Sequence, residues 1–240
     1  YEVHGILKRN SVAENQTARL TNCYDQLHLY YGDLTDLSSL INILQKVKPD
    51  EVYNLAAQSH VRISFDVPIY TAEADGIGVL KVIEACRFVC PDARIYQASS
   101  SEMFGNCIDD DGYQRETTPM LPVSPYGCAK VYAFNIVRNY RHSYGMHISN
   151  GILFNHESPR RGSNFVTSKI VQGAIAIKAG EATELRMGNL EARRDWGHAK
   201  DYVKAMYLML QQETPDDYVI ATGQAHSVKE FLNEVWNCAN

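Results

Sequence analysis

Short apolar runs alternate with longer stretches of helical period from the amino end to about residue 155. The runs are rich in Val, Ile and Tyr, and polar residues follow each of them. This alternation is typical of a parallel β-sheet covered by helices. We therefore predict strands at 2–7, 27–31, 51–55, 94–98 and 148–154, and helices at 36–47, 69–90 and 126–144.

The pattern becomes less regular after residue 155. It predicts a helix at 164–178, a strand at 183–187, a helix at 198–212, a strand at 217–221 and a last helix from Ser227, which opens with the capping box Ser227-Val-Lys-Glu230. The fold class is α/β. We predict a Rossmann-type, doubly wound parallel sheet in a domain of residues 1–155. Residues 156–240 then form part of a smaller α/β substrate-binding lobe, whose two strands either interleave with the main sheet or stand apart.

Both ends of the chain depart from the usual nucleotide-binding sheet. Such a sheet opens with a strand, a Gly-rich turn and a helix whose amino end receives a pyrophosphate. The sequence contains no G-x-G-x-x-G, and Gly76-Ile-Gly78 lies inside a helical pattern. The chain also stops at Trp236-Asn-Cys-Ala-Asn240, within an amphipathic helix. We expect a fragment that is cut at both ends and lacks the first strand and the Gly-rich turn.

Composition narrows the classes of partner. The net charge is −5, the sequence pI is about 5.9, and Lys and Arg are scattered, so no basic surface for nucleic acid or an anionic membrane is predicted. No run reaches the ~20 apolar residues of a membrane span. The six cysteines show no CxxC spacing, which argues against a metal site. We expect a cytoplasmic protein that acts on small molecules.

The segment IYQASSSEMFG (95–105) begins as a buried strand and ends in three hydroxyls and a carboxylate. In parallel sheets, ligands bind just beyond the carboxyl ends of the strands. Asp33, Ala56 to Ser59 and Ser99 to Glu102 fall at such ends. A solvated loop is the alternative interpretation of the serine-rich stretch.

Tyr126 and Lys130 lie four residues apart, on one face of the predicted helix that Ser124-Pro125 opens. A phenol is a poor base at neutral pH unless a nearby cation stabilises its phenolate. With Lys130 as that cation, Tyr126 could take a proton from a sugar hydroxyl while hydride passes to a nicotinamide ring. Ser100 would hydrogen-bond the hydroxyl, and Glu102 would add a second base. A surface Tyr–Lys pair and a solvated carboxylate are the alternatives.

A second base permits elimination. Once a sugar carbon is a ketone, the neighbouring C–H is acidified, and a carboxylate can remove that proton as the next carbon loses its hydroxyl as water. An epimerase needs no such base.

Seven segments closely resemble the GDP-mannose 4,6-dehydratase family, within the extended short-chain dehydrogenase/reductases that act on sugar nucleotides. The resemblance covers essentially the whole chain, and the fourth and sixth segments are its most specific parts. The segments are NLAAQSHV (54–61), YQASSSEMFG (96–105), SPYGCAK (124–130), GILFNHESPRRG (151–162), FVTSKI (165–170), RRDWGHAKDYV (193–203) and DYVIATGQAHSVKEF (217–231).

The resemblance implies an internal redox cycle. NADP takes hydride from C4 of the mannose, water is lost across C5 and C6, and the hydride returns to C6, which yields GDP-4-keto-6-deoxymannose for GDP-fucose or another deoxysugar. The resemblance also implies that Tyr126 and Lys130 are the redox pair and that Glu102 is the C5 base and C6 acid. Ser100 stands where the family usually has Thr. The implied partners are GDP-mannose and further copies of the chain, as a dimer or tetramer, with residues 10–22 reaching a neighbour's cofactor.

Cofactor and substrate residues follow from position and resemblance. An acidic residue after the strand at 2–7 would favour NAD, whereas Lys8 and Arg9 stand there and suit the 2′-phosphate of NADP. The further cofactor-binding residues are Asp33, Leu34, Leu55, Ala56, Ala57, Ser59, Tyr70, Lys130, His156 and Arg161. Asn155, Lys169 and Arg194 are the candidates for holding the GDP diphosphate, although Arg194 could instead form a surface ion pair with Asp195.

Two alternative functions stay open. The first is a related sugar-nucleotide epimerase or reductase. The second is an inactive, truncated binding subunit, which the missing Gly-rich turn favours.

Overall fold

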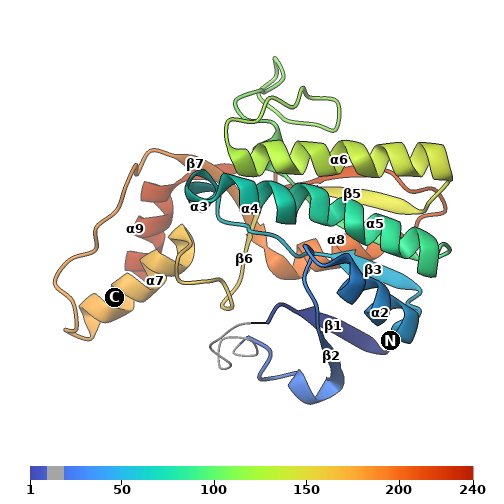
Figure 1. Cartoon of the computed structure of the whole chain (residues 1–240). Helices are drawn as coiled ribbons and strands as arrows, with labels where there is room; N and C mark the ends of the chain where they lie inside the picture. The colour runs from blue at the N-terminus through green and yellow to red at the C-terminus, as the bar shows by residue number, and fades with distance from the viewer. Residues whose placement is uncertain (10–18, 240) are drawn as a thin grey trace. The chain divides into compact units, whose positions relative to one another are not determined.

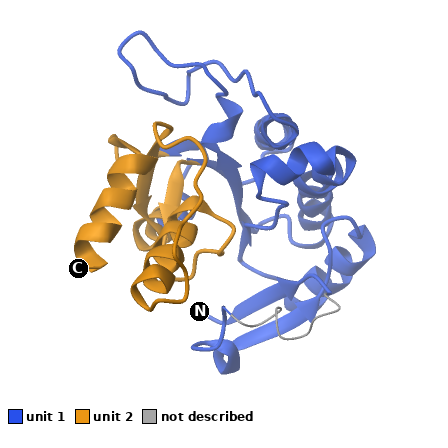
Figure 2. Ribbon diagram, turned by 90° about the vertical axis from the view of Figure 1, so that its left-hand side faces the viewer, with its two compact units in different colours: residues 1–152, 206–219 blue, residues 153–205, 220–240 orange. Residues whose placement is uncertain are grey.

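The computed structural model describes residues 1–9 and 19–239 (Figure 1). The predicted intersubunit segment, 10–22, lies mostly outside the described residues. The chain forms two compact units, each built from two stretches (Figure 2). The first unit is Tyr1–Ile152 with Met206–Val219, and the second is Leu153–Ala205 with Ile220–Asn240.

The strands of the first unit confirm the predicted α/β class with parallel sheets. Strands β1 (Val3–Leu7) and β2 (Leu27–Tyr31) pair in parallel, with Val3 opposite Leu27. A four-stranded sheet has the order β3-β4-β5-β8, in which β3 and β4 are parallel. Its strands are β3 (Glu51–Asn54), β4 (Arg94–Ser100), β5 (Ile148–Leu153) and β8 (Asp217–Ile220). The strand predicted at 217–221 thus extends this main sheet.

Helices pack around the sheet through their apolar faces. The central cluster joins Leu40 and Leu44, from one helix, to Val79, Ile83 and other fully buried side chains. Burying a side chain of this size stabilises the fold by about 1.5–3 kcal/mol. The helices of the first unit are α2 (Leu37–Val47), α3 (Val61–Asp66), α4 (Pro68–Ala72), α5 (Gly78–Val89) and α6 (Pro125–Tyr144).

The prediction of one continuous α-helix at 69–90 is wrong in the middle of this range. A π-helical turn, Glu73–Ile77, separates α4 from α5. Two glycines allow close packing there: a Cβ at Gly78 would lie 2.8 Å from Leu34 Cβ, and one at Gly76 would lie 3.4 Å from the Tyr132 ring. Hydrophobic periodicity did not reveal the turn because the residues on both sides of it remain helical.

The second unit holds a sheet of short strands in the order β6-β7-β9. Its strands β6 (Asn155–Glu157) and β7 (Arg193–His198) are parallel, and β9 (Ala225–Ser227) runs antiparallel to β7. Helices α7 (Val166–Lys178) and α9 (Val228–Ala239) belong to this unit, and α8 (Ala199–Leu210) begins in it. The predicted capping box is confirmed, because Ser227 N donates to Glu230 Oε2 at 2.8 Å and Glu230 N donates to Ser227 Oγ at 3.0 Å.

The strand predicted at 183–187 is wrong, since these residues form no strand. The Leu185 side chain packs on α7, where a Cβ at Gly173 would lie 2.7 Å from it. The carbonyl of Arg186 accepts a hydrogen bond from Lys169 Nζ at 2.7 Å. Helix packing and a side-chain donor therefore replace the sheet that the alternating pattern indicated.

Candidate active site

The end of β4 forms one wall of the candidate site. Ser100 is the last residue of the strand, and a 3₁₀ turn, Ser101–Met103, follows. Ser100 Oγ accepts a hydrogen bond from Glu102 N at 3.3 Å, so the hydroxyl caps the turn that carries the carboxylate. Met103 and Phe104 are fully buried and anchor the turn, whereas Glu102 remains half-buried.

The start of α6 lies directly on this turn. Ser124 is the N-cap, and its Oγ accepts from Gly127 N at 3.0 Å. Pro125 fills the first helical position, where its missing N–H costs nothing. A Cβ on Gly127 would lie 2.8 Å from the carbonyl oxygen of Glu102, so the approach requires glycine. The contact holds Tyr126 beside the Glu102 turn.

Tyr126 and Lys130 lie on the same helix, α6, as the four-residue spacing predicted, and both are buried, so they are not a surface pair. Lys130 Nζ lies 5.6 Å from the centroid of the Tyr126 ring and donates to Ala98 O at 3.0 Å. A buried ammonium needs such an acceptor because leaving its charge unsatisfied is costly. Lys130 therefore joins α6 to β4 two residues before Ser100. The structure brings all four predicted catalytic residues to the junction of β4 and α6.

Asp75, which the sequence reasoning missed, belongs to the same region. It is fully buried in the π-helical turn, and its Oδ1 accepts from Gln58 N at 2.7 Å. Its Oδ2 has no hydrogen-bond partner among the described residues. Burial raises the pKa of Asp75 to about 6, although the Lys130 cation and the Gln58 hydrogen bond act to lower it. An acidic residue directly before the Gly76-Ile-Gly78 stretch, inside a helical pattern, was the available sequence signal.

Three predicted cofactor residues meet near the ends of β1 and β2. Lys8 Nζ lies 3.1 Å from Asp33 Oδ2 and donates to the Tyr70 hydroxyl at 2.7 Å. The hydrogen bond with Tyr70 raises the pKa of Lys8, and Asp33 adds to the rise. Burial tends to raise the pKa of Asp33, but hydrogen bonds from Thr35 and Lys8 outweigh it, so the net pKa is lowered. Residues distant in sequence thus form one charged cluster at this edge.

The other predicted cofactor residues of the first unit lie at strand ends. The guanidinium of Arg9 is 6.0 Å from the Tyr31 ring, and Leu34 packs against the start of α5. In the turn after β3, Gln58 Oε1 accepts from His60 N at 2.9 Å and Nε2 donates to His60 O at 3.1 Å. These bonds shape the turn that carries Leu55, Ala56, Ala57 and Ser59, of which all but Ala57 are exposed.

The second unit carries the predicted cofactor residues His156 and Arg161. His156 Nδ1 lies 2.8 Å from Phe154 O, and its ring stacks on Tyr202 with centroids 4.7 Å apart. Arg161 Nε pairs with Glu157 Oε2 at 3.1 Å.

The predicted diphosphate residues also belong to the second unit. Asn155 pairs with Trp196 across β6 and β7, and Lys169 bonds Arg186 O. Arg194 Nη1 donates to the carbonyl of Arg193 at 2.7 Å. The alternative ion pair with Asp195 does not form among the described residues. Instead the Asp195 carboxylate accepts from the backbone N–H groups of Thr222 and Gly223, at 2.8–3.0 Å.

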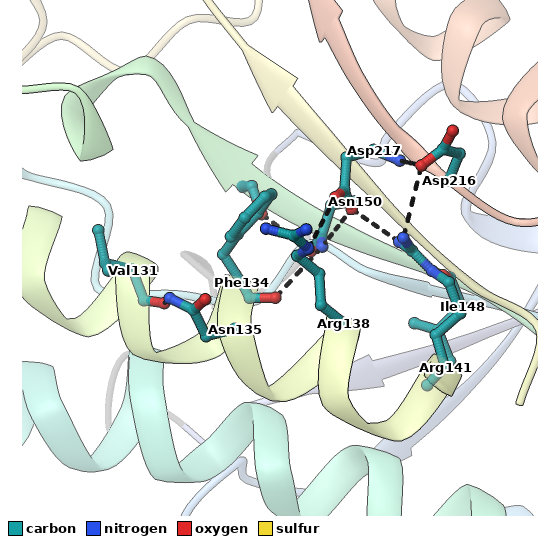
Figure 3. Close-up of polar contacts among 10 residues, drawn as sticks. Val131, Phe134, Asn135, Arg138, Arg141, Ile148, Asn150, Asp216 and Asp217 are labelled. Atoms are coloured by element: carbon teal, nitrogen blue, oxygen red, sulfur yellow. Dashed lines mark hydrogen bonds and ion pairs between the residues drawn. The ribbon is translucent and has the colours of Figure 1, made fainter. Parts of the chain in front are cut away.

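A second polar cluster, which we call the Asp217 network, lies at the other half of α6 (Figure 3). Asp217 Oδ1 accepts from Arg141 Nη2 at 2.7 Å and from Asn150 Nδ2 at 2.8 Å, and Arg138 Nε lies 3.4 Å from Oδ2. Asn150 Oδ1 accepts from Ser99 Oγ at 3.1 Å. The network ties α6, β5 and β8 to the residue before Ser100.

Two further findings concern metal ions and membranes. In the described part of the chain, no three His, Cys, Asp or Glu side chains gather in a way that could hold a metal ion. None of the helices described there combines the length and apolar character that crossing a bilayer requires.

Comparisons with known proteins agree with the resemblance. The family model described as GDP-mannose 4,6 dehydratase matches residues 1–239. A GDP-mannose 4,6 dehydratase of Drosophila melanogaster is 52% identical over 243 residues, covering 97% of this chain and 60% of that protein. A GDP-mannose 4,6-dehydratase of Vibrio cholerae is 54% identical over 241 residues, covering 97% of this chain and 64% of that protein. The chain thus spans less than two thirds of these relatives.

Solved structures share the fold at lower identity. DesIV, a dTDP-glucose 4,6-dehydratase from Streptomyces venezuelae with NAD and TYD bound, matches with a TM-score of 0.84 and 21% identity, covering 99% of this chain and 72% of that one. RMD from Pseudomonas aeruginosa complexed with NADPH matches with a TM-score of 0.83 and 21% identity, covering 99% and 84%.

Proposed function

The chain belongs to the GDP-mannose 4,6-dehydratase family, and from this premise we propose that it converts GDP-mannose to GDP-4-keto-6-deoxymannose with NADP. The observation that carries the proposal is the junction of β4 and α6, where the segments that carry a hydroxyl, a carboxylate, a phenol and an ammonium pack together. Such a set supplies both a redox pair and a separate base, and dehydration needs both.

The residues at the strand ends fit a nicotinamide dinucleotide phosphate. Lys8 and Arg9 are cations at the end of β1, where the 2′-phosphate would be bound, and the Lys8 ammonium is already oriented by Asp33 and Tyr70. The turn after β3 exposes Leu55, Ala56 and Ser59 for contact with the ribose and nicotinamide. When bound, the cofactor supplies the redox chemistry, taking hydride from C4 of the sugar and returning it to C6.

The transfer of the C4 hydroxyl proton involves Tyr126, Lys130 and Ser100. Lys130 stabilises the phenolate of Tyr126, which takes the hydroxyl proton as the carbon is oxidised. Ser100 hydrogen-bonds the same oxygen. Its oxygen accepts a hydrogen bond from the backbone N–H of Glu102, which ties the hydroxyl to the turn that carries the second base.

Glu102 performs the elimination. The 4-keto group acidifies the C5 proton, and the Glu102 carboxylate removes it while the C6 hydroxyl leaves as water. As the C6 acid, the protonated Glu102 supplies the proton that the departing C6 hydroxyl needs to leave as water. When hydride then reaches C6, C5 takes up a proton from solvent while Tyr126 releases the C4 hydroxyl proton to solvent, so the sequence balances as loss of one water. The carboxylate is half-buried and so remains accessible from the site.

The proposal assigns the GDP diphosphate to Asn155, Lys169 and Arg194, and further cofactor contacts to His156 and Arg161. Two fixed cations can neutralise adjacent phosphoryl groups. It also takes residues 156–240 as the substrate-binding lobe. The protein would act in the cytoplasm as a homodimer or homotetramer that feeds GDP-fucose or another deoxysugar.

The test is incubation of the protein with GDP-mannose and NADP, following the mass loss of one water. Glu102→Gln should lower dehydration by about 10²–10⁴-fold, because it removes a general base, while reduced nicotinamide still forms through Tyr126. Glu213→Gln, an exposed carboxyl after α8, is the matched control and should leave the rate unchanged. Near-normal water loss in Glu102→Gln would contradict the assigned role and favour an epimerase or reductase. No NADPH binding would favour a binding subunit.

A further inference from the structure

Asp75 is the buried ionisable group that the proposed mechanism does not use. It has no exposed surface, and only one of its two oxygens makes a hydrogen bond among the described residues. A buried carboxylate without a full set of partners is destabilising, and native proteins keep such groups rarely. Gln58 alone does not account for a charge here, since a neutral amide side chain could accept the same bond.

The backbone brings Asp75 to the candidate active site. The π-helical turn Glu73–Ile77 carries it, and π turns are frequent at functional sites. The turn packs on α6: a Cβ at Gly76 would lie 3.7 Å from Ala129 O and 3.9 Å from Ala129 Cα, one residue before Lys130. The Lys130 cation acts to lower the pKa of Asp75, against the rise that burial causes.

We propose that Asp75 is a positioning residue for the redox pair. Its Oδ1 fixes the turn after β3 through Gln58 N, and the negative charge on its carboxylate holds the Lys130 ammonium against Ala98 O. One side chain thereby couples the segment proposed to contact the nicotinamide to the cation proposed to act on Tyr126. The effect on turnover rests on the proposed function, whereas the coupling of Asp75 to Lys130 does not.

Asp75→Asn separates the two roles. The amide oxygen can still accept from Gln58 N, so the turn after β3 should keep its shape, but the negative charge is lost. We expect kcat to fall about tenfold with little change in the KM for GDP-mannose, because Lys130 is less firmly held while the proposed substrate contacts remain. Glu73→Gln, an exposed carboxyl in the same turn, is the matched control and should leave both constants unchanged.

Infrared titration tests the coupling without catalysis. The carbonyl band of protonated Asp75 is the band that disappears in Asp75→Asn. It should titrate near pH 6 in the wild-type protein and at a higher pH in Lys130→Met, where the cation that lowers the pKa of Asp75 is absent. Lys130→Arg keeps the charge and should titrate close to wild type.

The outcomes separate this inference from the proposed function. If the band titrates at the same pH in Lys130→Met as in wild type, Asp75 and Lys130 are uncoupled and the inference is wrong. If Lys130→Met does not fold, a kcat in Asp75→Asn equal to that of Glu73→Gln overturns it. If wild type does not dehydrate GDP-mannose but the band shifts as expected, the proposed function fails and the positioning of Lys130 stands.

Discussion

The two halves of α6 use polar residues in opposite ways. In the second half, both Asp217 oxygens have partners in Arg141, Asn150 and Arg138 (Figure 3). In the first half, Lys130 donates to Ala98 O, and in the π-helical turn that packs on this half Asp75 Oδ2 has no hydrogen-bond partner among the described residues. A fully satisfied network fixes a fold, whereas unused hydrogen-bonding capacity at a junction of elements is a feature of sites that receive a ligand. One helix thus anchors the sheet at one end and carries two of the proposed catalytic residues at the other.

The largest expected effect is on catalysis in the first half. Tyr126→Phe should reduce the proposed dehydration of GDP-mannose by about 10²–10⁴-fold, because the phenol that we propose exchanges the C4 hydroxyl proton is gone. The free energy of unfolding should change by less than about 1 kcal/mol, since the ring stays in place. Steady-state rates and urea unfolding measure the two quantities. A large loss of stability would show that the first half also anchors the fold.

In the second half of α6, a substitution is expected to lower the stability of the fold rather than to affect catalysis directly. Asp217→Ala should lower the free energy of unfolding by about 3 kcal/mol, because it leaves Arg141 and Asn150 without their main partner in a mostly buried position. Urea unfolding measures this change. Asp66→Ala removes an exposed pair with Arg62 and should change stability by less than about 0.5 kcal/mol. Equal effects in the two variants would refute the anchoring role of the network.

The raised pKa of Asp75, which lies beside the first half of α6, predicts that the free energy of unfolding depends on pH. Its pKa is raised from the ordinary value of ~3.9 to about 6, so between these values the native state binds the proton more tightly than the unfolded state. The contribution of Asp75 to the free energy of unfolding is therefore fully present below pH ~4 and is lost as the pH rises through 6. Relative to wild type, Asp75→Asn should gain about 2 kcal/mol of unfolding free energy between pH 4 and pH 7. A difference independent of pH would contradict the raised pKa.

The smallest effect concerns the cap that starts α6. Ser124→Ala removes the acceptor for Gly127 N and should lower the free energy of unfolding by about 1 kcal/mol. Ser124→Asp keeps an acceptor and should restore most of it. Thermal unfolding of the three proteins measures this order, and an alanine variant as stable as wild type would show that the contact with the Glu102 turn alone sets the helix start.

Local pattern predicted the main sheet and the long helices well. The strand at 27–31 has the predicted bounds, and α6 begins one residue before the predicted start at 126. Strong hydrophobic runs and the Ser124-Pro125 start signal are short-range features, so the sequence displays them directly. The short, polar strands β6, β7 and β9 were not predicted, because each becomes a strand only by pairing with residues distant in the chain.

By itself, the sequence determined the α/β class and the family, and it predicted Ser100, Glu102, Tyr126 and Lys130 as the catalytic residues, because these depend on residue types at fixed spacing. Only the tertiary structure decided which side chains meet. The contact of Gly127 with the Glu102 turn, the cluster of Lys8 with Asp33 and Tyr70, and the burial of Asp75 near Lys130 all join separate elements. Burial and distance set the charge states of such groups, and neither quantity exists until the chain has folded.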